Sequence, residues 1–228
     1  MIKKLFWYLS WNIRGKSDHA TAGVGRGDLN ENQLKELALE SISLLGLNDN
    51  DVLLDIGCAQ GYLTNIFSQK IKKAIGIDIS SSSIEKAKTL YKANKKIHFS
   101  QCKDEPSYNY EKENFSKIVC IDVVQYFTND KQFNKLCSEI YRMLKPGGKA
   151  LIGGIRIKKD RENNENKKFT RTIRTILGKE LAYLMHRTYT ENYLTSVAKE
   201  NKFEEFRLTK SEYYPGYFAV NLFLKKQL

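Results

Sequence analysis

The sequence is poor in the residues that build disulfide scaffolds and metal centres. It contains four cysteines, three histidines and three prolines among 228 residues. Cys58, Cys102, Cys120 and Cys137 are widely spaced, form no CxxC pair and have no histidine at metal-ligand spacing. Cysteines of this kind pack as small apolar side chains. We therefore expect a reduced, cytoplasmic protein with neither a disulfide nor a metal site.

Long apolar runs are also missing. No stretch approaches the roughly 20 apolar residues that a membrane-spanning helix needs, so no span is predicted. Lys3 and Lys4 precede a short apolar run, but Ser10 and Asn12 interrupt it and no small-residue cleavage site follows. We expect no secretion signal.

Positive charge is the strongest feature of the composition. The formal net charge is +12, of which residues 1–27 carry +4 and residues 155–187 carry +6. Such a field attracts phosphates, nucleotides, nucleic acid or acidic membrane surfaces. A lysine-rich solvated surface explains the excess equally well, and both interpretations stay open at this point.

The hydrophobic pattern predicts a single α/β domain. Short β-rich runs alternate with runs of helical spacing, which is typical of βαβ units on a parallel sheet. Strands are expected at 52–56, 74–79, 97–101, 117–121 and 149–157, and helices at 31–45, 61–69, 80–93, 130–144 and 191–200. Residues 203–213 and 217–224 are expected to form an antiparallel hairpin. The predicted fold is a Rossmann-like, seven-stranded, mostly parallel sheet with this hairpin at its end and helices on both faces.

One loop carries the clearest functional signal. In residues 52–64, VLLDIGCAQGYLT, an apolar strand leads through Asp55 into the small residues Gly57, Ala59 and Gly61 and then into a helix. Small side chains let a backbone turn tightly and approach a ligand, and the helix N-terminus offers free N–H groups. The spacing differs from the GxGxxG pattern of dinucleotide-binding loops. A nicotinamide-dependent dehydrogenase is therefore disfavoured.

This loop resembles the first motif of the class I S-adenosylmethionine-dependent methyltransferases. The resemblance implies that Asp55 and the loop, including Cys58, hold the amino-acid end of the cofactor. Ala59 stands where the family more often has glycine. Asp78 and Ile79 follow the next strand, and the resemblance implies that the Asp78 carboxylate accepts hydrogen bonds from both ribose hydroxyls.

The resemblance extends over residues 30–157. The third strand, in IHFSQCKDE (97–105), implies an adenine contact from Lys103 or Asp104. FSKIVCIDVVQYF (115–127) resembles the fourth strand and its exit loop, with Ser116 in place of the usual aspartate, and implies that residues 122–126 lie beneath the sulfonium. EIYRMLKPGGKALIGG (139–154) resembles the following helix, turn and fifth strand.

The expected reaction transfers a methyl group from S-adenosylmethionine and leaves S-adenosylhomocysteine. Because the donor is already activated, the protein mainly aligns an acceptor atom and excludes water. A hydroxyl or ammonium acceptor also needs a group that removes a proton. The candidate catalytic residues are Asp122, Tyr126, His19 and His186, whereas His98, at the start of a strand, is expected to be structural.

Substrate residues are expected in two segments outside the common pattern. Residues 1–29 form an N-terminal lid or substrate segment on the methyltransferase domain 30–228, and the basic insert 158–190 contributes to the acceptor pocket. The aromatic cluster at 6–11 is either core or lid. The candidate substrate residues are Trp11, Arg26, Tyr126, Arg171 and Arg174.

The charge in these segments favours an anionic small-molecule acceptor, phosphate-bearing or related to sugar nucleotides or glycans. An RNA methyltransferase is the alternative enzyme, because phosphate contacts dominate nucleic-acid affinity. A non-catalytic binding partner that keeps the cofactor fold is the alternative of another class. The sequence indicates no oligomeric state.

Overall fold

In a computed structural model, the described residues are 2–17, 29–102, 107–158, 186–210 and 219–228. They contain one seven-stranded sheet in the order β3-β2-β1-β4-β5-β7-β6. Strands β1 to β5 pair in parallel, and β7 is antiparallel to both β5 and β6, as the sequence predicted. The strands are β1 (Val52–Ile56), β2 (Lys73–Asp78), β3 (Ile97–Gln101), β4 (Phe115–Ile121), β5 (Leu144–Arg156), β6 (Glu205–Lys210) and β7 (Ala219–Lys225).

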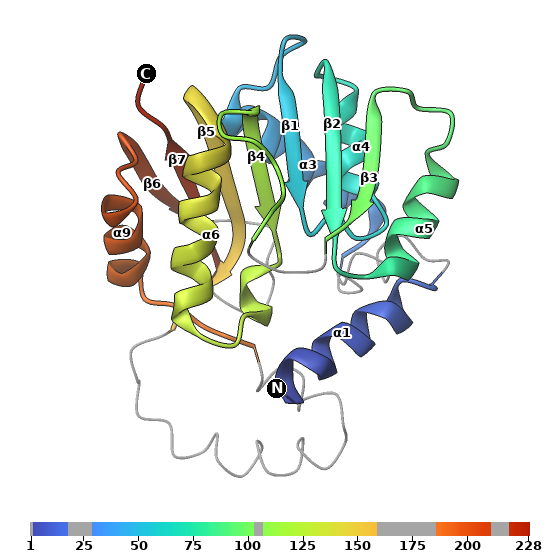
Figure 1. The fold of residues 1–228 in the computed structure, drawn as a ribbon, viewed down its shortest axis with the longest axis horizontal. Coiled ribbons are helices and arrows are strands. Elements are labelled where there is room, and N and C mark those ends of the chain that lie inside the picture. Colours follow the sequence, from blue (N-terminus) through green and yellow to red (C-terminus); the bar gives the residue numbers. More distant parts are fainter. Residues whose placement is uncertain (1, 18–28, 103–106, 159–185, 211–218) are drawn as a thin grey trace.

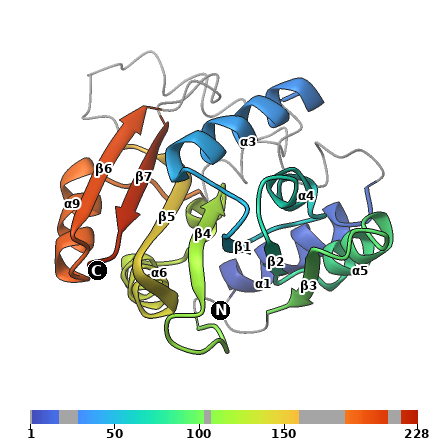
Figure 2. The same cartoon turned by 90° about the horizontal axis from the view of Figure 1, so that it is seen from above.

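Helices cover both faces of this sheet (Figure 2), which confirms the predicted fold class. The helices α3 and α4 lie on one face, and α6 and α9 lie on the other. The helical elements are α1 (Ile2–Arg14), α3 (Glu31–Leu45), α4 (Tyr62–Ser68), α5 (Ser81–Leu90), the 3-10 turn η1 (Val124–Tyr126), α6 (Asp130–Met143) and α9 (Glu191–Glu200).

The first residues of these helices could be predicted well because each capping residue lies next to its helix in the sequence. The Asn30 side chain accepts a hydrogen bond from the Gln33 N–H, Gln33 reciprocates, and Gly46 ends α3 at φ 60°. Ser80 and Thr190 cap α5 and α9 in the same way. Several element boundaries differ from the prediction, and the start of β5 differs most. The turn expected at 145–148 belongs to β5, which begins at Leu144 opposite Phe115 and shifts register before Lys149.

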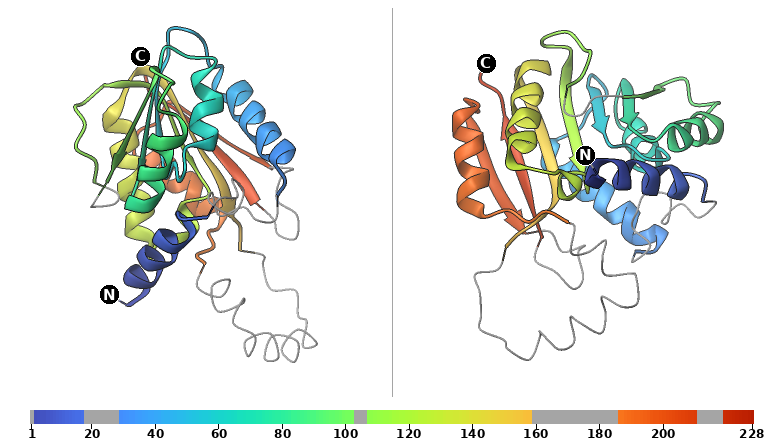
Figure 3. Two further views of the ribbon diagram at one scale, coloured as in Figure 1. Left: turned by 90° about the vertical axis from the view of Figure 1, so that its right-hand side faces the viewer. Right: turned by 60° about the horizontal axis from the view of Figure 1, so that its bottom comes forward.

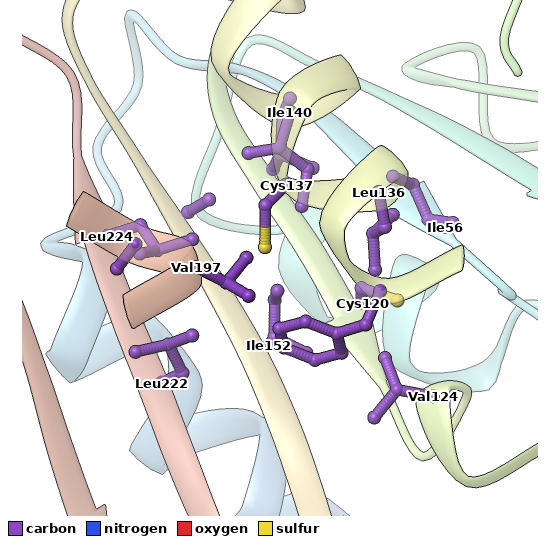
Figure 4. Close-up of a cluster of buried hydrophobic side chains, with 14 of the residues drawn as sticks. Ile56, Cys120, Val124, Leu136, Cys137, Ile140, Ile152, Val197, Leu222 and Leu224 are labelled. Carbon is purple, nitrogen blue, oxygen red and sulfur yellow. The ribbon is translucent and has the colours of Figure 1, made fainter. Parts of the chain in front are cut away.

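Alternation along the strands divides the core in two. Leu53 faces α3 and α4, whereas Leu54 faces α6. Figure 4 shows the cluster on the α6 face of the sheet. In it, Cys120 and Cys137 pack among aliphatic side chains from β5, β7, α6 and α9. All four cysteines are free thiols.

The helix α1 lies across the edge of the sheet where the parallel strands end (Figures 1 and 3). It contacts α5 and brings an N-terminal segment to the carboxyl ends of β1, β2 and β4. Ligands of open α/β sheets bind at this edge. We therefore expect the functional site to lie between α1 and the sheet.

Candidate active site

A crevice opens between α1 and the carboxyl ends of the strands. Side chains of α1 meet there with the loops after β1, β2 and β4. Its lining residues are Trp7, Trp11, Gly57, Ala59, Asp78, Ile79, Ile121, Asp122, Val123, Tyr126, Phe127, Thr128 and Gln132. The crevice contains predicted cofactor residues from three different strands and the predicted substrate residues Trp11 and Tyr126.

The loop after β1 is held in an unusual backbone conformation. Gly57, Ala59 and Gly61 all have positive φ, at 79°, 48° and 81°. The N–H groups of Gly57 and Cys58 donate to the Ile77 carbonyl at 2.8 and 3.0 Å, which fixes the loop to β2. A Cβ on Gly57 would lie 2.2 Å from Cγ2 of Val123. Only glycine fits at this position.

The Asp78 carboxylate links the two loops that border the crevice. Its Oδ2 accepts a hydrogen bond from the Ala59 N–H at 2.9 Å, and its Oδ1 accepts one from the Ser80 N–H at 2.8 Å. Burial raises the pKa of Asp78, while these backbone donors oppose the shift. Asp78 thus organises the loop and also forms part of the crevice wall.

Asp55 is more deeply buried beneath the same loop. The Thr64 hydroxyl donates to its Oδ2 at 2.6 Å. Burial raises the pKa of Asp55 to about 7; the Thr64 hydrogen bond opposes the shift and the Asp78 charge adds to it. Asp55 lines a smaller cavity that shares Gly57, Ala59 and Asp122 with the main crevice.

The loop after β4 carries a second strained position. Asp122 has φ 58°, its N–H donates to the Gly153 carbonyl at 3.0 Å, and its carbonyl accepts from the Gln125 side chain at 2.8 Å. Strained non-glycine residues often occur at functional sites. Burial and the Asp122 carboxylate raise the pKa of Tyr126, outweighing the opposite effects of Arg14 and Arg156. Tyr126 therefore stays protonated at neutral pH.

An aromatic cluster forms the wall of the crevice opposite the loop after β1. Tyr126 contacts Trp7 and Trp11 edge-on, with ring centroids 4.7 and 5.1 Å away. His186 stacks on Trp7 at 5.2 Å and meets Tyr126 edge-on at 5.1 Å. Trp7 is 4% exposed, as the core interpretation of the N-terminal aromatics expects, and it also lines the crevice.

Sequence reasoning missed the residues that attach α1. The buried Gln60 side chain donates to the carbonyls of Gly15 and Ser17 at 3.0 and 2.9 Å. The Asn12 carbonyl accepts from the Ser82 hydroxyl at 2.7 Å, and the Ser81 hydroxyl donates to its side chain at 3.2 Å. The run of four serines at the start of α5, residues 80–83, is the signal in the sequence that could have indicated this attachment.

Other predicted site residues lie outside the described part of the chain. They are His19, Arg26, Lys103, Asp104, Arg171 and Arg174. Within the described ranges, no group of three or more histidine, cysteine or acidic side chains is arranged to hold a metal ion. None of the helices described is long and apolar enough to cross a membrane.

Comparison with known proteins finds a methyltransferase domain in the middle of the chain. Residues 53–148, from β1 into β5, match the family model described as a methyltransferase domain. That match includes the strained loop, Asp78 and Asp122. Residues 53–148 therefore form a methyltransferase domain, which supports S-adenosylmethionine-dependent methyltransferase activity.

Individual relatives of this methyltransferase agree with that assignment. A ubiquinone biosynthesis O-methyltransferase of Coxiella burnetii is 24% identical over 171 residues, which are 72% of this chain and 68% of the relative. Two solved structures share the fold. Geranyl diphosphate C-methyltransferase from Streptomyces coelicolor has a TM-score of 0.69 at 14% identity, covering 99% of this chain and 98% of its own. Magnesium protoporphyrin IX methyltransferase from Synechocystis has a TM-score of 0.68 at 13% identity, covering 99% and 100%.

Proposed function

We propose that this enzyme methylates an oxygen or nitrogen atom of an anionic small molecule, phosphate-bearing or related to sugar nucleotides or glycans. The observation that carries the proposal is the buried indole N–H of Trp7, which has no hydrogen-bond acceptor among the described residues. An indole nitrogen only donates, and we assign its missing hydrogen-bond acceptor to an oxygen of the acceptor molecule. Arg14 and Arg156 add positive charge, because both act on the pKa of Tyr126 in the same crevice.

The crevice residues fit S-adenosylmethionine, which supplies an activated methyl group when bound. We assign Asp78 to the ribose hydroxyls and Ile79 to the adenosine side. We assign Asp55 and the loop residues Gly57, Cys58, Ala59 and Gly61 to the amino-acid end. Asp122 closes the site beneath the reacting methyl group. Support comes from the two buried carboxylates beside a loop in which a Cβ on Gly57 would collide with Val123.

The other half of the crevice is assigned to the acceptor. Trp11 and Tyr126 position it, and the raised pKa of Tyr126 makes its hydroxyl a hydrogen-bond donor rather than a base. Asp122 or His186 removes a proton where the acceptor requires it. His186 stacks against Trp7, next to the unpaired indole N–H. One structural neighbour is described as a geranyl diphosphate C-methyltransferase, and geranyl diphosphate is a phosphate-bearing molecule.

The remaining assignments depend in part on residues outside the described ranges. Residues 1–29 would act as lid and substrate segment on domain 30–228, with Arg26 beside the acceptor. Arg171 and Arg174, from the insert 158–190, would bind its anionic group, Lys103 or Asp104 would contact the adenine, and His19 is a further candidate base. A cytoplasmic location belongs to the same proposal.

Exchange of Trp7 for phenylalanine tests the proposed acceptor. Trp7→Phe keeps an aromatic ring and removes the N–H, so we expect the acceptor KM to rise about tenfold, as for a lost hydrogen bond to a charged group. Cofactor affinity should stay unchanged, and thermal unfolding measures the stability that is lost with the smaller buried ring. Steady-state kinetics with isotopically labelled S-adenosylmethionine and a metabolite extract, followed by mass spectrometry, provides the assay.

The control for this experiment is the same extract after phosphatase treatment. Loss of labelled product in the treated extract supports a phosphate-bearing acceptor. Product that forms equally in both extracts, or that forms only with added RNA, contradicts the proposal.

Cofactor binding is expected to depend on pH through Asp55. The pKa of Asp55 is about 7, and the ammonium group of the cofactor favours the ionised carboxylate. Binding should therefore weaken by up to about tenfold for each pH unit below that pKa and level off above it. Isothermal titration calorimetry measures this profile and the proton released on binding. The Asp55→Asn variant should give a flat profile, and a pH-independent affinity of the unmodified enzyme would refute the assignment.

A further inference from the structure

The outer face of α1 is an exposed apolar stripe. Leu5, Leu9 and Ile13 follow one another at four-residue spacing and are 56%, 52% and 72% exposed. Residues at this spacing lie along one side of a helix. Tyr8 flanks them and is 40% exposed. The four side chains thus form one continuous surface, which we call the α1 stripe.

Other parts of the α1 surface pack against the domain, whereas the stripe does not. Trp7 is buried against the crevice, and Asn12 holds the serines at the start of α5. Gly15 is packed so closely that a Cβ there would lie 2.5 Å from the hydroxyl oxygens of Ser82 and Ser83. The side chains of the stripe stay exposed on α1, which lies at the carboxyl edge of the sheet (Figure 3).

Exposed apolar side chains are concentrated on α1. Elsewhere in the described ranges, the large exposed apolar residues are the separate Leu39, Leu90 and the terminal Leu228. Single exposed leucines need no explanation, whereas a contiguous patch marks an interaction site. The α1 stripe is the only such grouping along one helix in the part of the chain that the structure describes.

Charge around the stripe indicates what covers it. Arg14 and Lys16 are exposed at the C-terminal end of α1, and its first turn contains Lys3 and Lys4. Residues 1–27 carry a net charge of +4. A second copy of this chain would bring these like charges together. An anionic lipid surface accepts both the aliphatic stripe and its basic flanks.

We propose that α1 docks on a membrane surface that contains anionic lipids, with its stripe in the interfacial layer. The same helix contributes Trp7 and Trp11 to the crevice, so docking places the mouth of the crevice at the lipid–water boundary. This contact is peripheral, and it goes beyond the proposed function without depending on the identity of the acceptor.

Vesicle co-sedimentation tests the docking. Vesicles of mixed phosphatidylglycerol and phosphatidylcholine should bind the full-length enzyme, pure phosphatidylcholine should bind it weakly, and added salt should weaken binding. The double variant Leu9→Gln/Ile13→Gln should lower partitioning about tenfold, because two apolar side chains leave the interface. Lys16→Gln should lower it about fivefold, as expected for one basic residue near an anionic surface.

Matched controls lie on α5. Leu90→Gln and Lys88→Gln remove an exposed leucine and an exposed lysine of similar kind and should leave vesicle binding unchanged. Cofactor affinity measured by calorimetry should be the same in every variant, which separates this proposal from the proposed function. Absence of binding to anionic vesicles overturns the inference. Equal loss in the α5 controls, or a dimer that dissociates when Leu9 and Ile13 are replaced, would also overturn it.

Discussion

Asp78→Asn is expected to weaken S-adenosylmethionine binding about a hundredfold, or about 3 kcal/mol, because a charged acceptor of hydrogen bonds is lost. The Asp78 carboxylate also holds two backbone N–H groups, and the asparagine amide can replace it only in part. It accepts from the Ala59 N–H and the Ser80 N–H, so an amide NH₂ group must face one of these donors. Both the ribose contact and the shape of the loop therefore suffer. Isothermal titration calorimetry measures the loss.

The matched control is another buried aspartate at the opposite edge of the sheet. Asp51 is 5% exposed, accepts from the Ser116 hydroxyl at 2.8 Å and from the Asn48 N–H at 2.9 Å, and lies 3.6 Å from the Lys117 ammonium. Asp51→Asn should lower the melting temperature and leave cofactor affinity intact. If both variants lose affinity equally, the effect is a general loss of folding, and the role of Asp78 at the ribose is wrong.

The arrangement of the loop after β1 could be predicted because its determinants are local. An apolar strand that ends in an acid, followed by small residues and a helix, specifies a tight turn at the carboxyl edge. The left-handed backbone at Gly57 and Gly61 agrees with that expectation. Asp78 was predictable for the same reason, since parallel strands in βαβ order place their ends side by side.

Ser116 shows what the pattern alone could not predict. The family pattern usually has an aspartate at this position, whereas this chain has a serine. In the structure the Ser116 hydroxyl donates to Asp51 and also accepts a hydrogen bond from the Val52 N–H at 2.9 Å. The carboxylate is thus supplied from the start of the neighbouring strand. Only the sheet register brings these residues together.

The attachment of α1 was unpredictable for a similar reason. Gln60 lies within the most recognisable motif, yet its partners Gly15 and Ser17 lie more than 40 positions earlier in the chain. The sequence also left open whether Trp7 belongs to the core or to a lid. Periodicity shows that one side of a helix is apolar, but it does not show which surface that side contacts. In α1 two different sides carry apolar residues, and each has a different environment.

Gly57→Ala is expected to abolish measurable cofactor binding. The new methyl group would lie 2.2 Å from Cγ2 of Val123, and both residues line the crevice. Relief of the overlap must displace either the loop after β1 or the loop after β4. The left-handed backbone and the overlap together should cost about 3 kcal/mol of folding stability. Calorimetry and thermal unfolding measure the two effects separately.

Gly46→Ala separates backbone strain from steric overlap. Gly46 also has positive φ, at 60°, but the nearest atom to a Cβ there is the Lys149 ammonium nitrogen at 4.0 Å. This variant should lose about 1 kcal/mol of stability through its left-handed backbone and bind the cofactor normally. If Gly57→Ala behaves like Gly46→Ala, the loop tolerates a side chain and its close approach to the β4 exit is not required. If only Gly57→Ala loses binding, then the space that glycine leaves open beside Val123 is itself part of the cofactor site.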